Sequence, residues 1–108
     1  MSYEASRRIV AERDKCCFLC LHESGIISPI ESIHHVVARS KWGREDEAKH
    51  EVRNLVGLCG KCHQYHKPYV SSFDMTVYIL GLLHKLHGYE YRDEKYAHWA
   101  RTLYEEDQ

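Results

Sequence analysis

The sequence contains no apolar run that approaches the roughly 18 residues of a membrane-spanning helix, since the stretch 77–80 ends at Gly81. The first residues lack the apolar segment of a secretory signal as well. Without export, the five cysteines are expected to stay reduced and to bind metal rather than form disulfides, and their odd number agrees with this. We therefore expect a cytoplasmic protein.

Internal repeats, low-complexity tracts and interdomain linkers are also missing from the 108 residues. We expect a single domain that spans residues 1–108. The hydrophobic content of 44% is ordinary for a globular protein and excludes a largely disordered chain. A core of this size buries a limited fraction of the chain's surface, so a metal cross-link would stabilise the fold materially.

A clear excess of positive charge, common in DNA-binding domains, is lacking too, because the formal net charge is -1. Residues 31–67 carry seven basic and five acidic side chains and are the most positive part of the chain. Bound divalent ions would add to this charge, although zinc-bound thiolates would offset part of the gain. The charge pattern therefore supports a nucleic-acid partner only through this segment.

Against these absences stand two matched cysteine pairs, Cys17-x-x-Cys20 and Cys59-x-x-Cys62. Two pairs with two-residue gaps supply four thiolates, and tetrahedral zinc takes four ligands. We predict a structural Zn²⁺ site at these four residues. The fifth cysteine, Cys16, is expected to lie outside the metal site.

Local patterns predict short strands between helices. A helix capped by Ser2 is expected to run to about Asp14. Two further helices are expected within about residues 71–104, with Gly88 ending the first and Asp93 capping the second. Between the first helix and these two we predict a strand at residues 30–37 and a long loop at 39–53 with a helical turn near residues 45–50. A second strand at 54–58 and a short helix at 60–67, stopped by Pro68, should follow.

A histidine doublet, an asparagine and a further histidine stand in order around the cysteine pairs: Ile33-His34-His35-Val36, Asn54-Leu55-Val56 and Leu58-Cys59-x-x-Cys62-His63. The run resembles the HNH endonuclease family, in the subgroup with a four-cysteine zinc site. The resemblance covers about residues 15–67, and small phage and mobile-element members are similar in size and layout. It implies an α+β fold with a zinc-stabilised ββα-metal (His-Me finger) core and flanking helices.

The resemblance also implies roles for individual residues. It makes His35 the general base, Asn54 the family asparagine, and His34 and His63 the ligands of a catalytic ion. The family often has a proline and paired glycines after the histidines, where this chain has Ala38 and Trp42-Gly43. The course of that loop, and any DNA contact of its residues, therefore does not follow from the family pattern.

The chemistry of phosphodiester hydrolysis agrees with these roles. One divalent ion at His34 and His63 would leave open positions for a phosphate oxygen and water, and would stabilise the phosphorane. His35 follows His34 on a strand, so its ring should face the other way and stay free to take a proton from water. Asn54 is expected to tie the loop backbone through side-chain hydrogen bonds. His66, three residues after His63, is a candidate third ligand or phosphate contact.

The sequence thus predicts a metal-dependent endonuclease that cuts or nicks DNA, expected to be double-stranded, and leaves 5′-phosphate and 3′-hydroxyl ends. Mg²⁺ is the favoured catalytic ion, with Mn²⁺, Ni²⁺ and Zn²⁺ as alternatives. Candidate DNA-binding residues are Arg39, Lys41, Lys61 and Lys67. A non-catalytic zinc-knuckle DNA-binding module, and an assembly subunit that is active only within a larger DNA-processing complex, are the two alternatives.

The remaining histidines and the aromatic tail carry simpler expectations. His22, His50, His84, His87 and His98 have no partner identifiable from sequence and are expected to be surface or satisfied polar residues. The tyrosines and tryptophan after residue 88 are expected to pack helices together rather than to stack on nucleobases.

Overall fold

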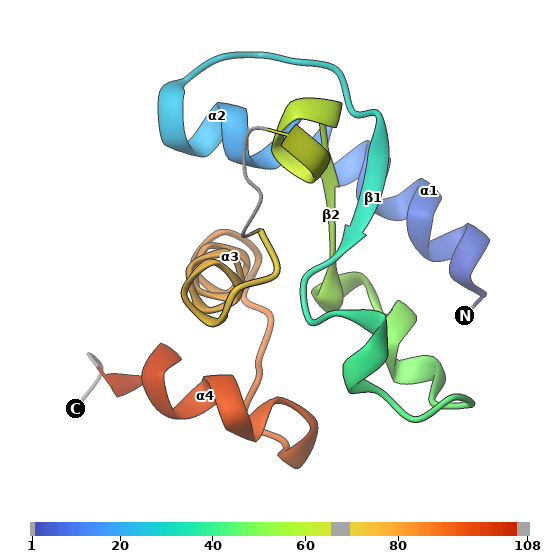
Figure 1. Ribbon diagram of the computed structural model, residues 1–108, viewed down its shortest axis with the longest axis vertical. Helices are drawn as coiled ribbons and strands as arrows, with labels where there is room; N and C mark the ends of the chain where they lie inside the picture. The colour runs from blue at the N-terminus through green and yellow to red at the C-terminus, as the bar shows by residue number, and fades with distance from the viewer. Residues whose placement is uncertain (1, 66–69, 106–108) are drawn as a thin grey trace.

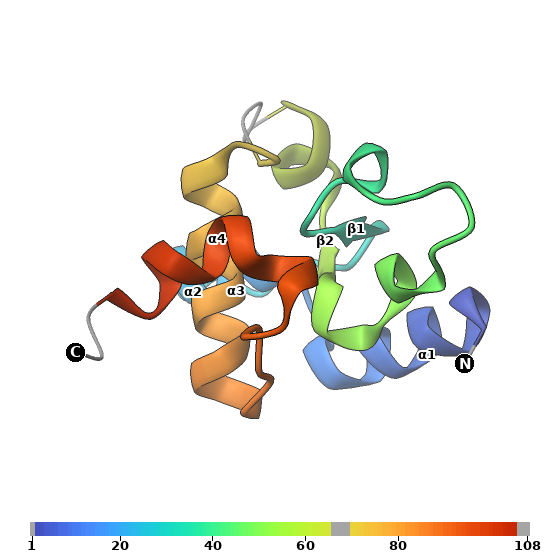
Figure 2. The same cartoon turned by 90° about the horizontal axis from the view of Figure 1, so that it is seen from below.

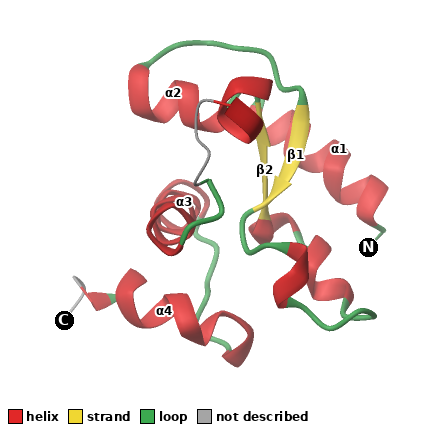
Figure 3. Cartoon of the chain, in the orientation of Figure 1, coloured by secondary structure: helices red, strands yellow, loops and turns green. Residues whose placement is uncertain are grey.

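A computed structural model of the chain, which describes residues 2–65 and 70–105, shows two short strands surrounded by helices (Figures 1 and 3). The helices are α1 (Tyr3–Asp14), α2 (Phe18–Ser24), α3 (Phe73–His87) and α4 (Ala97–Leu103), and the strands are β1 (Ser32–His35) and β2 (Leu55–Leu58). The α+β class expected from the sequence is confirmed. None of the helices in the described ranges has the length and apolar character needed to cross a membrane.

The two strands form an antiparallel pair that lies between α1 and α3 (Figures 1 and 2). His34 pairs with Val56 and His35 with Leu55, so the histidine doublet lies at the C-terminal end of β1, beside the first residues of β2. Both strands were expected from the sequence, and each is shorter than predicted. Their pairing brings residues about 20 positions apart side by side, and it positions the candidate site described below.

The first helix begins and ends where local chemistry predicts. The Ser2 hydroxyl accepts a hydrogen bond from the Ala5 amide at 3.1 Å and so caps α1. At the other end the Arg13 guanidinium donates to the carbonyl of Leu55 at 2.6 Å, and the Asp14 carboxylate accepts from the Gly57 amide at 2.8 Å. These bonds satisfy backbone groups on β2 and attach α1 to the sheet.

Gly57 gives room where β2 passes the loop before β1. A Cβ atom at this position would lie 2.5 Å from Cδ1 of Ile30, closer than van der Waals contact allows. A larger residue here would force the Ile30 side chain to move.

The C-terminal helices cover the core on the side away from α1. Helix α3 starts after Ser72, whose hydroxyl accepts from the Met75 amide, and it ends at Gly88 with φ of 73°. Its buried face carries Ile79, Leu80 and Leu83. Tyr91 and Tyr96 are fully buried, so the expectation that the aromatic tail packs the helices is confirmed for these rings.

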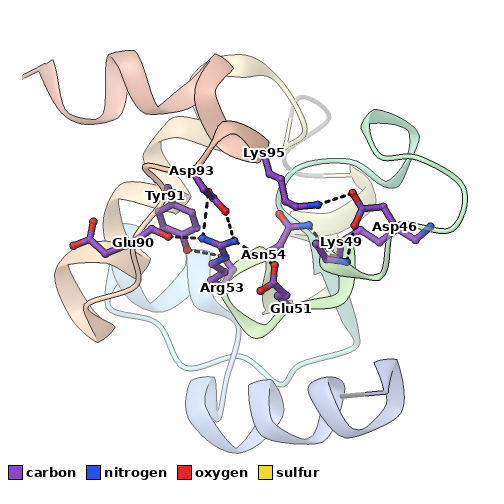
Figure 4. A network of polar contacts seen from close by, with 10 residues as sticks. Asp46, Lys49, Glu51, Arg53, Asn54, Glu90, Tyr91, Asp93 and Lys95 are labelled. Atoms are coloured by element: carbon purple, nitrogen blue, oxygen red, sulfur yellow. Dashed lines mark hydrogen bonds and ion pairs between the residues drawn. The ribbon is translucent and has the colours of Figure 1, made fainter.

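A polar network joins the C-terminal region to the segment before β2 (Figure 4). The Arg53 guanidinium donates to the Glu90 carbonyl at 2.7 Å and to the Asp93 carboxylate at 2.8 Å, and it lies 4.5 Å from the centre of the Tyr96 ring. The Tyr91 hydroxyl donates to the Arg53 carbonyl. Because these contacts connect positions about 40 residues apart, they fix the course of the chain just ahead of Asn54.

The region predicted as a long loop contains three short 3-10 helical turns, at Arg39–Lys41, Glu47–His50 and Val52–Asn54. The helical turn expected near residues 45–50 is confirmed by the second of these. The short helix expected at 60–67 is a π-helical turn over Lys61–Tyr65, and its predicted end lies outside the described residues.

Candidate metal centre and histidine cleft

The four paired cysteines come together at one point, as the spacing predicts. The sulfur atoms of Cys17, Cys20, Cys59 and Cys62 all lie within 4.8 Å of one another. Cys20 Sγ is 3.8 Å from Cys59 Sγ and 3.7 Å from Cys62 Sγ. A tetrahedron of sulfurs about 2.3 Å from a central zinc has edges of about 3.8 Å, so these thiols could hold a metal ion such as Zn²⁺.

Local structure explains how these cysteines converge. Cys17 precedes α2 and its amide donates to the Ser28 carbonyl at 2.7 Å, while Cys20 lies on the helix itself. Cys59 follows β2, and Cys62 lies on the π-helical turn. Each C-x-x-C pair therefore sits where the chain turns at an element boundary, and the packing of α2 against β2 brings the two pairs together.

The electrostatics of the cluster favour a bound cation. Burial raises the pKa of the thiols of Cys17 and Cys62. Burial also acts on Cys59, but hydrogen bonds from the Cys62 amide and the neighbouring thiols outweigh it and lower the pKa of Cys59. The buried thiols of Cys17 and Cys62 therefore resist ionisation on their own, and a divalent ion would supply the charge that stabilises four thiolates. Cys16 is buried beside the cluster and does not join it, as expected.

Three histidines predicted to act together line a single cavity of about 440 Å³. His34 and His35 enter it from β1 and His63 from the π-helical turn, and Arg39 and Ser40 form part of its rim. We call this cavity the histidine cleft. It lies next to the cysteine cluster in the chain, because His63 directly follows Cys62.

The rings of His34 and His63 lie close together in the cleft in an edge-on arrangement. Their ring centres are 5.5 Å apart and the ring planes meet at 68°. Two imidazoles that share one ion at about 2.1 Å would place their ring centres about 5 Å apart, so the observed arrangement suits a shared ion. The Nε2 atom of His34 is buried and has no hydrogen-bond partner among the described residues, as a ligand atom kept for a cation would.

Burial, followed by the charges of His63 and His35, lowers the pKa of His34 to about 4. The ring is therefore neutral near pH 7, which is the form that binds metal ions.

His35 has a different set of partners. Its Nε2 atom lies 3.0 Å from Nδ1 of His50, and the centre of its ring lies 5.3 Å from the centre of the Tyr3 ring. Burial first, and then the positive charges of His50, Arg39 and Lys49, lower its pKa to about 4. A neutral imidazole that stands apart from the His34–His63 pair is able to accept a proton.

Asn54 ties the loop backbone in the way expected from the sequence. The residue is fully buried, and its Oδ1 accepts from the Val37 amide at 2.8 Å. Its Nδ2 donates to the carbonyls of Val37 at 3.2 Å and Lys49 at 3.0 Å. Asn54 therefore joins the segment that follows β1 to the turn that carries His50. These bonds hold together the two segments that carry His35 and His50.

The three candidate DNA-binding residues that the structure describes line three different cavities. Arg39 lines the histidine cleft, and Lys41 lines a neighbouring cavity with Trp99. Lys61 lies beside the cysteine cluster. His66 and Lys67 lie outside the described residues.

His50 is the residue that sequence reasoning missed. It was expected to be a surface or satisfied polar group and is the latter, since it is buried against Tyr3 and its Nδ1 lies within hydrogen-bond distance of His35, a contact that the sequence did not indicate. Its position on the one helical turn predicted inside the charged loop, four residues before Asn54, was the available signal.

Comparison with known proteins adds no assignment, since no protein-family model, curated protein or solved structure matches the chain.

Proposed function

We propose that this protein is a metal-dependent HNH endonuclease, built on a zinc-stabilised ββα-metal core, that hydrolyses DNA phosphodiester bonds to 5′-phosphate and 3′-hydroxyl ends. The observation that carries the proposal is the histidine cleft, where His34, His35 and His63 line one cavity beside a four-cysteine cluster. A protein that needed only a zinc clamp would gain nothing from burying two neutral histidines at an open cavity, because buried polar groups cost free energy unless they are paired.

His34 and His63 would hold the catalytic ion. Mg²⁺ is the proposed working ion, and the imidazole donors also suit Mn²⁺, Ni²⁺ or Zn²⁺. When bound, such an ion supplies positive charge next to the scissile phosphate. The unpartnered Nε2 of His34 and the neighbouring ring of His63 support this assignment.

His35 would act as the general base. Its burial keeps the ring neutral, and the negative charge of a bound phosphate would raise its pKa toward the value that suits a base near pH 7. Arg39 lies on the rim of the same cavity and carries the positive charge that a phosphate would meet on entering it.

A non-catalytic zinc module that binds DNA is the second candidate. It is favoured by the fact that, within the part of the chain that the structure describes, the cysteine cluster is the one group of three or more cysteine, histidine or acidic residues close enough to share an ion. An assembly subunit whose nuclease core cuts only within a larger DNA-processing complex would use the same site as the first candidate and would show weak cleavage alone, rescued by its partner.

Conversion of supercoiled plasmid to nicked and linear forms, measured with Mg²⁺, Mn²⁺, Ni²⁺ and Zn²⁺ in turn, tests the proposal. Replacing His35 by alanine should lower the rate by about 10²–10⁴-fold, because the base is lost while the ion site remains. The control is His87→Ala, which removes an exposed histidine at the end of α3, far from the cleft in sequence. Equal cleavage by wild type and His35→Ala would refute the assigned base, and DNA binding without cleavage by any ion would favour the second candidate.

A further inference from the structure

Three side chains form a line from the protein surface to the histidine cleft. The exposed Glu47 carboxylate lies 3.9 Å from Nε2 of His50. Nδ1 of His50 lies 3.0 Å from Nε2 of His35. His35 in turn lines the cleft. Nothing in the roles assigned so far requires a second buried histidine or an acidic residue behind the base.

The position of the middle ring is well defined. His50 and His35 are 8% exposed each, and the Tyr3 ring stacks on His50 with centres 4.4 Å apart at 29°. The His50 ring meets the His35 ring edge-on at 64°. The 3.0 Å contact between Nε2 of His35 and Nδ1 of His50 requires an N–H on one of these nitrogens and a lone pair on the other, so the ring that accepts is a neutral imidazole.

The direction of the hydrogen bond between the rings follows from the carboxylate. A negative charge beside Nε2 of His50 favours the tautomer that keeps its proton on that nitrogen. Nδ1 of His50 is then an acceptor, so the 3.0 Å bond must be donated by the Nε2–H of His35. The nitrogen of His35 left without a proton is Nδ1.

We propose that Glu47 and His50 are positioning residues that hold His35 in its Nε2–H tautomer, so that Nδ1 is the atom that accepts the proton from water. The tautomer itself is inferred from the contacts along Glu47, His50 and His35. The use of Nδ1 as a base rests on the proposed function. The opposite tautomer would place an N–H on Nδ1 and leave only Nε2, which is hydrogen-bonded to His50, to accept a proton.

In the hydrolytic step, Nδ1 of His35 takes one proton from water while the water oxygen forms a bond to phosphorus. The bond between phosphorus and the 3′ oxygen breaks, and this oxygen takes up a proton from solvent. The imidazolium formed on His35 keeps its Nε2–H bond to His50 and then returns the extra proton to solvent. The partners of His35 thus remain the same before and after the proton is taken.

Nitrogen-15 NMR of the zinc-loaded full chain, labelled at histidine, reads the tautomer directly. The His35 signals are identified by their loss in His35→Ala, and we expect the wild type to carry its proton on Nε2. His50→Asn places an amide oxygen where Nδ1 stood and should keep this tautomer. His50→Phe keeps a ring for Tyr3 to stack on but removes the acceptor, and should shift the proton toward Nδ1.

The exposed Glu47 offers a variant that does not disturb packing. Its side chain is 76% exposed, so Glu47→Gln should fold as the wild type does and should raise the Nδ1–H population of His35 by a smaller amount than His50→Phe. A wild-type His35 protonated on Nδ1 would overturn the inference. So would an unchanged tautomer population in both Glu47→Gln and His50→Phe.

Cleavage rates separate this inference from the proposed function. For His50→Phe we expect kcat to fall by about 10- to 100-fold with KM unchanged, as for other residues that orient a reacting group, and His50→Asn should recover part of the loss. If the protein cleaves no DNA but His35 carries Nε2–H, the proposed function fails and the positioning line stands. If it cleaves and His50→Phe is as fast as wild type, the positioning role fails and the endonuclease stands.

Discussion

The cysteine cluster and the histidine cleft are neighbours built on the same segment of chain, yet they are complete to different degrees. Cys62 and His63 are adjacent on one π-helical turn, so one element serves both sites. The four sulfur atoms already stand at the spacing that zinc requires. The cleft has a pair of neighbouring rings, a third ring with separate partners and a cavity open to solvent.

The difference reflects how each site is assembled. A C-x-x-C pair brings two ligands together within one turn, so the cluster needs only a single long-range contact between its halves. The cleft depends on several distant contacts, including His34 with His63 and His35 with His50. We infer that the cluster stabilises the fold, and that the cleft, held by that fold, carries the chemistry.

The largest expected effect comes from removing one ligand of the cluster. Cys20→Ser should abolish stoichiometric zinc binding and lower the free energy of unfolding by about 3 kcal/mol or more, because the binding energy of a structural zinc is folding energy. Metal analysis and urea unfolding measure the two effects. The matched control is Cys16→Ser, a buried neighbour outside the cluster, which should retain zinc. Retention of one zinc per chain by Cys20→Ser would show that the cluster is not the metal site.

A smaller loss is expected from the residue that holds the cleft together. Asn54→Ala removes three hydrogen bonds and leaves the Val37 amide and the Lys49 carbonyl without the partner that Asn54 supplied, while the Val37 carbonyl keeps its bond from Trp42. The free energy of unfolding should fall by about 2–4 kcal/mol, since a buried polar group without a partner costs about 1–3 kcal/mol.

Zinc content should not change in Asn54→Ala, because none of these bonds involves a cysteine. Urea unfolding and metal analysis on the same sample test both halves of the prediction. Loss of zinc together with stability would mean that the two sites are one cooperative unit, which would contradict the division drawn between them.

The parts of the molecule that the sequence predicts are those set by local chemistry. Ser2 begins α1, Gly88 ends α3, and each C-x-x-C pair supplies half of the cluster, because each of these depends on residues within one or two turns. The role of Asn54 in tying the loop also follows from its type and place. All of these are visible to a reader of the bare sequence.

What the sequence conceals depends on distant pairings. In the sequence, His50 is one histidine in a charged loop. In the structure, polar contacts drawn in Figure 4 hold this loop, and the Tyr3 ring stacks on His50. Arg13, near the end of α1, gives no sign in sequence that it will donate to carbonyls some 40 residues away. The π-helical turn is equally hidden, since nothing local distinguishes it from an α-helix.

The smallest expected effect comes from removing one positive charge beside each site, which compares the histidine cleft with the cysteine cluster directly. Arg39→Gln removes a cation from the rim of the histidine cleft, whereas Lys61→Gln removes one beside the cysteine cluster. Both side chains are exposed, so neither change should alter stability measurably. If DNA enters the cleft, Arg39→Gln should weaken DNA binding by about 1 kcal/mol and reduce the slope of log affinity against log salt by about 1. Lys61→Gln should leave both unchanged, as measured by fluorescence anisotropy with a short duplex at several salt concentrations. The opposite ranking would place the DNA over the cysteine cluster, and the cleft would then lack the contact with phosphate that the proposed endonuclease activity requires.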